Sequence, residues 1–321
     1  MTTDSIAGRL ERLGILDTRE EPDPAWYRVL RFVCIWLYLM LFCAGAALLL
    51  THMARPASAS VSAPAAAAVE CEDDGLHSVR GGGECLAIRT LDGGRGADGA
   101  STLLVLIHGD NSGGGPSGFP MQHLRRFATP GVTVVSLIRP GYYDSEGRRS
   151  SGTSYRFTGD GYRPQVVDAV GDAIARLRRL HQARKVVVAG VSGGSAIAGV
   201  LLGRRPGLID AAVLAGCPCD VQRWRDLRGS GHWRRSLSPH AFAGQVPADT
   251  FVLAVTGEED TNTRPELARD YIDALRSHGV DAHFVLAPGT PHPRLRRSEA
   301  LDAAIEQALA HVRPTGVKTQ K

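Results

Sequence analysis

The feature that most constrains this chain is a Gly-x-Ser-x-Gly pentapeptide at residues 190–194. It follows the apolar run 185–189 and precedes the small and apolar stretch 196–202. A serine between a buried strand and a helix sits in a sharp, strained turn, and the flanking glycines avoid clashes with nearby backbone. The turn raises the hydroxyl above the carboxyl edge of a sheet, so the pattern predicts a nucleophilic Ser192. A plain packing turn rich in glycine is the alternative.

The partners that an activated serine needs follow downstream in a fixed order. The apolar strand 250–256 runs into Asp260 through Gly257, and the strand 282–287 precedes a proline-rich loop that carries His292. A serine hydroxyl is a weak nucleophile that an imidazole activates, and a carboxylate orients the imidazole. We therefore predict Ser192 as nucleophile, His292 as general base and acid, and Asp260 as the orienting carboxylate.

Other residues compete for two of these roles. Glu258 and Glu259 lie beside Asp260, which we prefer because it is furthest from the strand end, beyond the expected tight turn. His232 and His240 are alternative bases, although neither directly follows a strand of the expected sheet. Asp260 as a surface acid and His292 as a surface histidine are the corresponding non-catalytic alternatives.

A further loop predicts an oxyanion hole. The buried strand 102–107 runs into the glycine-rich segment 108–115, which starts His-Gly-Asp. Loops of this type donate a backbone N–H to the negative charge that develops on the substrate oxygen. We predict the backbone N–H groups of Asp110 and Gly193 as the two donors. A glycine-rich loop without a ligand is the alternative, and the pattern of a phosphate-binding loop is absent from the sequence.

These motifs together resemble the α/β-hydrolase superfamily, and most closely its prolyl-oligopeptidase-like and esterase-like branches, over about residues 76–312. The resemblance rests on His108-Gly109-Asp110, Arg139-Pro140-Gly141-Tyr142, Gly190–Gly194, Gly257–Asp260 and Gly289–His292. It implies a mostly parallel eight-stranded sheet flanked by helices. It also implies hydrolysis of an ester, amide or peptide bond without a metal or organic cofactor. The sequence departs from the family where Pro291 and Pro293 flank His292, which either stiffens the loop or tilts the ring.

The coarse pattern of the chain agrees with this fold. Strand-like runs alternate with helical segments from residue 102 onward, as in a parallel α/β sheet. Apolar spacing predicts helices over 165–181, 264–278 and 294–312, each covering a sheet face. Residues 220–246 break the pattern and are predicted to form a short cap whose tryptophans shape the substrate pocket, with a packed surface loop as the alternative.

The N-terminal region predicts a membrane anchor. Residues 32–50 are uncharged and almost wholly apolar, which is long enough to span a bilayer core, and Trp26, Tyr27, Arg28 and Arg31 precede them as interfacial anchors. A cleaved signal peptide is the alternative. We expect a cytoplasmic tail at 1–31, a transmembrane helix at 32–52, an Ala/Ser/Pro-rich linker at 53–70, the hydrolase domain at 71–313 and a disordered tail at 314–321.

The cysteines agree with a catalytic domain in the periplasm or outside the cell. The four that follow the apolar span are Cys71, Cys85, Cys217 and Cys219, an even number that suits an oxidising compartment. Cys71 and Cys85 flank a polar stretch that a disulfide would close, and Cys217-Pro-Cys219 has the spacing of a local bridge. Buried free thiols are the alternative, and metal binding is disfavoured because a second ligand pair with suitable spacing is missing.

The charge of the chain disfavours one class of partner. The formal net charge is +4, carried mainly by scattered arginines, and a basic stripe interleaved with aromatic residues is missing, which disfavours nucleic-acid binding. We therefore expect a membrane-anchored serine hydrolase that takes a small-molecule ester or peptide substrate and contacts the bilayer through residues 32–50. A catalytically silent α/β-hydrolase-fold binding protein at the membrane is the alternative.

Overall fold

The computed structural model of the protein describes residues 36, 40, 71–96, 101–155 and 159–313. The chain divides into two units, Met1–Ala67 and Ala68–Lys321. The tails and linker predicted at 1–31, 53–70 and 314–321 lie outside the described residues. So does the membrane span predicted at 32–52, apart from Trp36 and Met40, which are helical and exposed. Within the described residues, no helix has the length and apolar character that a membrane crossing requires.

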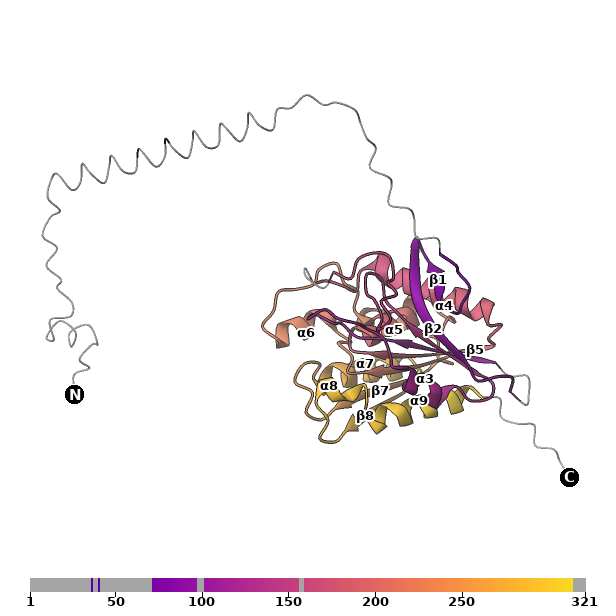
Figure 1. Cartoon of the computed structure of the whole chain (residues 1–321). Coiled ribbons are helices and arrows are strands. Elements are labelled where there is room, and N and C mark those ends of the chain that lie inside the picture. Colours follow the sequence, from indigo (N-terminus) through magenta and orange to yellow (C-terminus); the bar gives the residue numbers. More distant parts are fainter. Residues whose placement is uncertain (1–35, 37–39, 41–70, 97–100, 156–158, 314–321) are drawn as a thin grey trace, which may run out of the picture. The chain divides into compact units, whose positions relative to one another are not determined.

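A mixed sheet runs through the centre of the described part of the second unit (Figure 1). It has eight strands in the order β1-β2-β4-β3-β5-β6-β7-β8. The antiparallel pairings are those of β2 with β1 and with β4, and the other neighbours are parallel. The sheet is thus mostly parallel, with its antiparallel pairings confined to one edge. The strands are β1 (Ser78–Gly81), β2 (Glu84–Asp92), β3 (Thr102–Ile107), β4 (Val132–Leu137), β5 (Lys185–Val191), β6 (Ala211–Ala215), β7 (Phe251–Gly257) and β8 (Asp281–Ala287).

The parallel strands bring the predicted site residues to one edge of the sheet. All residues of β3, β6 and β7 are buried, as expected for central strands covered on both faces. Ile107 pairs with Gly190, and Val191 pairs with Ala215, so β3, β5 and β6 end at nearly the same level. The loops after these strands therefore meet at the carboxyl edge, where the chain continues into His108 and Ser192.

Helices cover both faces of the sheet (Figure 1). One face packs against α4 (Pro164–Leu180), α5 (Gly193–Arg204) and α7 (Pro265–Ser277), and the other against α3 (Met121–Phe127) and α9 (Glu299–Val312). Alternate residues of β3 serve the two faces: Leu103 and Val105 join the first core, while Leu104 and Leu106 join the second. The helices predicted over 165–181 and 264–278 are confirmed as α4 and α7.

The single helix predicted over 294–312 is wrong. The chain forms a short helix α8 (His292–Leu295), a turn, and then α9. Ser298 ends the turn as the N-cap of α9, and its hydroxyl accepts a hydrogen bond from the backbone N–H of Leu301. This break places Arg296 and Arg297 in an exposed turn directly after α8.

The segment 220–246 contains α6 (Val221–Leu227) and a 3₁₀ helix, η1 (Pro239–Gln245). Trp224 is buried, and its indole N–H donates to the carbonyl of Asn262. Its ring contacts Trp233, which in turn packs on Tyr162 with ring centroids 5.3 Å apart. The two tryptophans therefore join this segment to Tyr162, and its role as a cap stays a prediction.

Candidate active site

Ser192 occupies the sharp turn between β5 and α5. Its backbone has φ 52° and ψ −119°, a conformation that side-chain-bearing residues rarely adopt. The turn leaves no room for side chains at the neighbouring glycines: a Cβ at Gly190 would lie 2.5 Å from the Gly194 backbone, and one at Gly194 would clash with the Ile107 carbonyl. The pentapeptide therefore forms the strained strand–turn–helix that the sequence predicts.

His292 lies within hydrogen-bond distance of Ser192. The His292 Nε2 atom is 3.1 Å from Ser192 Oγ. His292 is the first residue of α8, with Pro291 at the N-cap and Pro293 in the first turn. Proline fits these positions because the first helical N–H groups have no partner within the helix. The two prolines thus begin a helix and leave the imidazole directed at the serine.

Asp260 holds the other nitrogen of the imidazole. Its Oδ2 atom is 2.7 Å from His292 Nδ1, and the carboxylate is almost fully buried. The backbone N–H groups of Asn262 and Thr263 donate to Oδ1 at 3.0 and 2.8 Å. These bonds compensate the buried carboxylate for lost hydration and fix its orientation.

Thr263 is a member of this site that the sequence does not indicate. Its hydroxyl lies 2.9 Å from Asp260 Oδ2 and 3.0 Å from His292 Nδ1. The neighbouring carboxylates do not take part in this way, since Glu258 and Glu259 are exposed and Glu258 accepts a hydrogen bond from the Gly289 N–H. Among the three acids, the geometry agrees with the preference for Asp260.

The alternative bases have other surroundings. His232 is exposed, and its Nε2 atom lies 2.6 Å from Asp226. His240 is also exposed, at the beginning of η1. Neither has a hydrogen bond with Ser192 among the described contacts. The arrangement therefore pairs the serine with His292.

The two residues predicted to form the oxyanion hole lie against each other. Gly193 follows the serine at the N-terminus of α5, where backbone N–H groups and the helix dipole favour negative charge. A Cβ at Gly193 would lie 2.6 Å from Asp110 Oδ1. The loop after β3 thus packs directly on the turn that carries Ser192. The donor role of both N–H groups stays a prediction.

The Asp110 side chain belongs to a buried polar network that fixes this loop. Arg139 Nη1 donates to Asp110 Oδ1 at 2.8 Å, and the Tyr162 hydroxyl donates to Oδ2 at 2.5 Å. Arg139 and Tyr162 are 1% and 0% exposed, so water does not compete for these bonds. Burial and the Asp110 charge raise the pKa of Tyr162, and the Asp110 charge raises the pKa of Arg139 against the opposing effect of burial.

His108 completes the network as a neutral residue. Its Nδ1 atom lies 2.7 Å from the Gly109 carbonyl, and its Nε2 accepts from the Arg139 backbone N–H at 3.0 Å. This pair of contacts fixes the tautomer with the proton on Nδ1. Burial, together with the Arg139 charge, lowers the pKa of His108 to about 3. His108 therefore orients the loop and does not act as a base at neutral pH.

Two disulfides join the four cysteines that follow the apolar span. Cys71 is bonded to Cys85, with 14 residues of sequence separation, and Cys217 is bonded to Cys219. The second bridge is fully buried and directly follows Gly216, where a Cβ would lie 3.1 Å from His292 Cε1. These are the pairings that the cysteine spacing suggests, and one of them adjoins the ring of His292.

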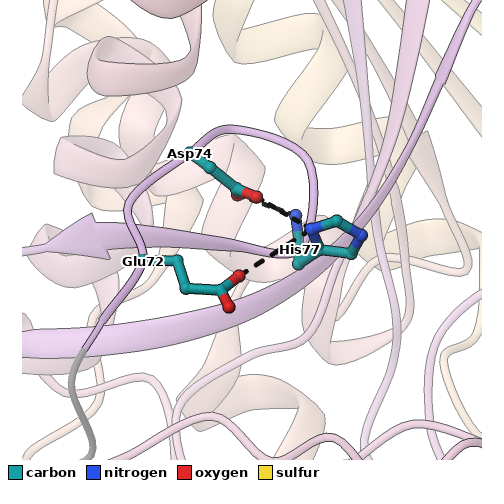
Figure 2. Close-up of side chains that lie close together, drawn as sticks. All are labelled: Glu72, Asp74 and His77. Carbon is teal, nitrogen blue, oxygen red and sulfur yellow. Dashed lines mark hydrogen bonds and ion pairs between the residues drawn. The ribbon is translucent and has the colours of Figure 1, made fainter.

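A small surface cluster precedes β1. Figure 2 shows the Glu72, Asp74 and His77 side chains directed toward one another, with His77 Nδ1 2.8 Å from Asp74 and 3.8 Å from Glu72. Asp74 Oδ1 also accepts from the backbone N–H groups of Leu76 and His77. These bonds lower the pKa of Asp74, although partial burial opposes them. The contacts are those of a capped turn with exposed ion pairs, so the cluster gives no support for a metal site.

Comparisons with known proteins agree with this geometry. The model of the prolyl oligopeptidase family, Peptidase_S9, matches residues 142–313. Among curated proteins, nothing matches the chain.

Solved structures show the same fold. The uncomplexed acylaminoacyl peptidase of Pyrococcus horikoshii is 13% identical, with a TM-score of 0.54 over 72% of this chain and 39% of that chain. The proline iminopeptidase of Mycobacterium smegmatis is 13% identical, with a TM-score of 0.53 over 73% of this chain and 98% of that chain. A puromycin hydrolase is 18% identical, with a TM-score of 0.55 over 70% of this chain and 36% of that chain. The chain thus spans about two fifths of the length of the acylaminoacyl peptidases that it resembles.

Proposed function

Because the chain belongs to the prolyl oligopeptidase family and is a serine hydrolase with the α/β-hydrolase fold, we propose that it cleaves an ester, amide or peptide bond through Ser192, His292 and Asp260. The observation that carries this proposal is the unbroken series of contacts from Ser192 Oγ through the His292 imidazole to the Asp260 carboxylate. The distances, 3.1 and 2.7 Å, are those over which a proton moves between such groups.

The reaction proceeds in two steps. His292 Nε2 takes the hydroxyl proton while Ser192 Oγ bonds to the substrate carbonyl carbon, and the carbonyl oxygen becomes an oxyanion. The backbone N–H groups of Asp110 and Gly193 stabilise that charge. His292 then gives its proton to the leaving alcohol or amine, and an acyl-enzyme remains. Water, deprotonated by His292, attacks the ester carbon, and the acid leaves as Ser192 regains its proton.

Asp260 supports both steps without exchanging a proton. Because its carboxylate lies at His292 Nδ1, the imidazole keeps a proton on that nitrogen and presents a free lone pair at Nε2. The same carboxylate stabilises the imidazolium that forms when Nε2 takes the serine proton. The Thr263 hydroxyl donates to the same carboxylate oxygen and the Thr263 backbone N–H to the other one, and these two bonds limit the rotation of the carboxylate.

Labelling with a fluorophosphonate probe tests the proposal, because the probe reacts with activated serines. The unmodified protein should be labelled, and Ser192→Ala and His292→Ala should not be labelled. His232→Ala is the matched control, since it removes an exposed histidine that also pairs with an aspartate, and it should keep full labelling. Folded protein that resists the probe, or labelling that survives Ser192→Ala, would overturn the assignment in favour of a silent binding protein or a different nucleophile.

We also propose that the enzyme is anchored in a membrane through residues 32–52 and acts in the periplasm or outside the cell. The uncharged apolar run 32–50 supports the anchor. The two disulfides support an oxidising compartment, because cytosolic thiols are kept reduced. The hydrolase domain of residues 71–313, which contains both disulfides, would then act in that oxidising compartment.

A further inference from the structure

Two adjoining cavities lie beside the proposed nucleophile and share part of their walls. The first, of about 40 Å³, is lined by Gly109 and Val191 and also by Phe119, Arg296 and Arg297. The second, of about 170 Å³, shares Phe119 and both arginines with the first and continues to Asp144. The α8–α9 turn therefore forms a wall common to both cavities.

The first cavity is lined by two residues that adjoin Ser192. Val191 directly precedes Ser192, and Gly109 lies against it: a Cβ at Gly109 would be 3.0 Å from Ser192 Cβ and 3.7 Å from Ser192 Oγ. Gly109 thus belongs both to the wall of this cavity and to the immediate surroundings of the serine hydroxyl. A substrate whose carbonyl carbon meets Ser192 can therefore extend into this cavity and toward Arg296 and Arg297.

The two arginines give this wall an uncompensated positive charge. Neither side chain makes a hydrogen bond or an ion pair with another residue of the described part of the chain, and both are exposed. Another doublet, Arg204 and Arg205, differs in this respect, since these arginines pair with Asp168 and Asp172.

The remaining charges of the cavity walls are balanced or absent. Asp144 is paired with Arg148 at 2.6 Å and with Arg89 at 3.5 Å, and Arg89 also bonds to Glu146. The first cavity also contains two histidines: burial lowers the pKa of His108 to about 3, and it lowers the pKa of His123, which lies 3.7 Å from Asp302. The surplus charge beside the nucleophile thus comes from Arg296 and Arg297.

We propose that Arg296 and Arg297 bind an anionic group of the substrate, so that the enzyme prefers esters or amides that carry a carboxylate a few bonds from the scissile carbonyl. The inference rests on the proposed function and adds a substrate class to it. A guanidinium presents a fork of N–H donors that matches a carboxylate, and a neighbouring second guanidinium adds attraction at longer range. The anion belongs either to the acyl part or to the leaving group, and the test separates these two sources.

Paired chromogenic esters test the preference. On the acyl side, the mono-p-nitrophenyl ester of glutaric acid is compared with the uncharged p-nitrophenyl ester of monomethyl glutarate. On the leaving-group side, the butyrate ester of 4-hydroxybenzoate is compared with that of methyl 4-hydroxybenzoate. We expect kcat/KM to favour the anionic member of at least one pair by about tenfold, the effect of a charge-assisted hydrogen bond at a partly solvated site.

Variants assign this preference to the two arginines. In Arg296→Gln/Arg297→Gln, the ratio of kcat/KM for the anionic and neutral esters should fall to near one, mainly through KM. Arg296→Lys/Arg297→Lys should keep part of the ratio. The control Arg269→Gln/Arg313→Gln removes the same total charge from exposed arginines of α7 and the end of α9, and it should keep the full ratio.

Binding of the esters to Ser192→Ala separates the proposed hydrolysis from the proposed binding of an anionic group by Arg296 and Arg297. If the proposed function fails and no ester is hydrolysed, titration of the intact esters into this variant still shows whether the anionic member binds about tenfold more tightly. Equal kcat/KM and equal binding for both members of each pair would overturn the inference. A preference that persists in Arg296→Gln/Arg297→Gln would overturn it as well.

Discussion

Residues 257–260 place three carboxylates close together, yet their surroundings differ. Asp260 is buried and contacts His292, whereas Glu258 and Glu259 are exposed. We expect Asp260→Asn to lower kcat by about 10³- to 10⁴-fold, because an amide no longer holds the imidazole in the tautomer that accepts the serine proton. Glu258→Gln should stay within about twofold of the parent enzyme. Steady-state kinetics on a neutral ester, with thermal melting to verify folding, measure both.

The reverse order of these effects would reject the assignment. If Glu258→Gln lost as much turnover as Asp260→Asn, the carboxylate that orients His292 in solution would be a different one. If Asp260→Asn stayed within tenfold of the parent enzyme, the imidazole would be oriented chiefly by Thr263.

His108 makes the stability of the fold depend on pH in a predictable direction. Its pKa is lowered from the ordinary 6.5 to about 3. Between these pH values His108 binds a proton in the unfolded chain but stays neutral in the folded protein. The contribution of neutral His108 to the free energy of unfolding is therefore complete above pH 6.5 and falls as the pH decreases toward 3. At pH 5 the loss amounts to about 2 kcal/mol.

His108→Gln isolates this effect, because glutamine keeps an amide that can hydrogen-bond but does not titrate. We expect the free energy of unfolding of the parent protein to exceed that of His108→Gln by the largest margin near pH 7, and the margin to shrink by about 2 kcal/mol at pH 5. Urea denaturation at the two pH values measures it. A margin that stays constant or widens on acidification would show that His108 is protonated in the fold.

At this scale the sequence predicts the residues that directly follow strands and misses those that tertiary packing brings in. Ser192, Asp260 and His292 each come shortly after an apolar run, so the order of the chain was enough to select them. Tyr162 contacts Asp110 across 52 residues, from a segment with no motif. Thr263 contacts His292 across 29 residues. Sequence spacing alone carries no information on such distant pairs.

At the scale of elements, the Cys71–Cys85 disulfide ties the segment ahead of β1 to β2, at the antiparallel edge of the sheet. In the chain-entropy model, a closed loop of this length stabilises the fold by about 3 kcal/mol. We expect Cys71→Ala/Cys85→Ala to lower Tm by about 6–12 °C, as measured by scanning calorimetry. Turnover at 25 °C should change little, because neither cysteine adjoins Ser192 or His292 among the described contacts.

Cys217→Ala/Cys219→Ala is the informative comparison. This bridge spans a separation of only 2 residues, so it restricts the unfolded chain much less, but it follows Gly216, which packs on His292. Its loss should therefore affect kcat more than the Cys71–Cys85 double variant does. Equal effects of the two double variants on both Tm and kcat would contradict the assignment of Cys71–Cys85 to stability and of Cys217–Cys219 to the surroundings of His292.

The elements themselves were predicted to different degrees. The buried strands β3 and β7 match the apolar runs at 102–107 and 250–256 because a strand covered on both faces is apolar almost throughout. The helix over 294–312 failed because apolar spacing alone does not report where a helix is interrupted. Ser298, followed by Glu299 and Asp302 in the first turn of α9, is the N-cap signal that marks the true start.

At the scale of the whole molecule, the net charge is small, but two of the arginines differ from the others in their surroundings. The chain has a net charge of +4, and most arginines of its described part lie on helices and loops. What distinguishes Arg296 and Arg297 is the absence of a partner within the described residues and their position in a cavity wall. The scattered arginines disfavour nucleic acid as a ligand, but composition alone does not indicate an anionic substrate. That inference depends on where the fold places Arg296 and Arg297.

The membrane anchor is argued from the sequence of residues 32–50, and it makes the last prediction. We expect the full chain, expressed with a C-terminal tag, to remain in the membrane fraction after carbonate extraction and to be released by detergent. Leu41→Arg should weaken this retention, since an arginine near the centre of a span costs about 2.5–3.5 kcal/mol. Leu76→Arg is the control, because Leu76 is 51% exposed in the domain of residues 71–313. This variant should leave membrane retention unchanged.

The N-terminus of the mature protein separates an anchor from a cleaved signal peptide. An anchor leaves residues 1–31 attached, whereas cleavage at the small-residue sites between Ala57 and Ala68 yields a shorter chain that carbonate extracts. Protease added to intact spheroplasts should digest the domain of residues 71–313 and spare the N-terminal tail, because the arginines before the span favour a cytoplasmic N-terminus. A chain that starts after residue 57 would show that the apolar run acts only in export, and a domain that resists protease until lysis would place the hydrolase in the cytoplasm.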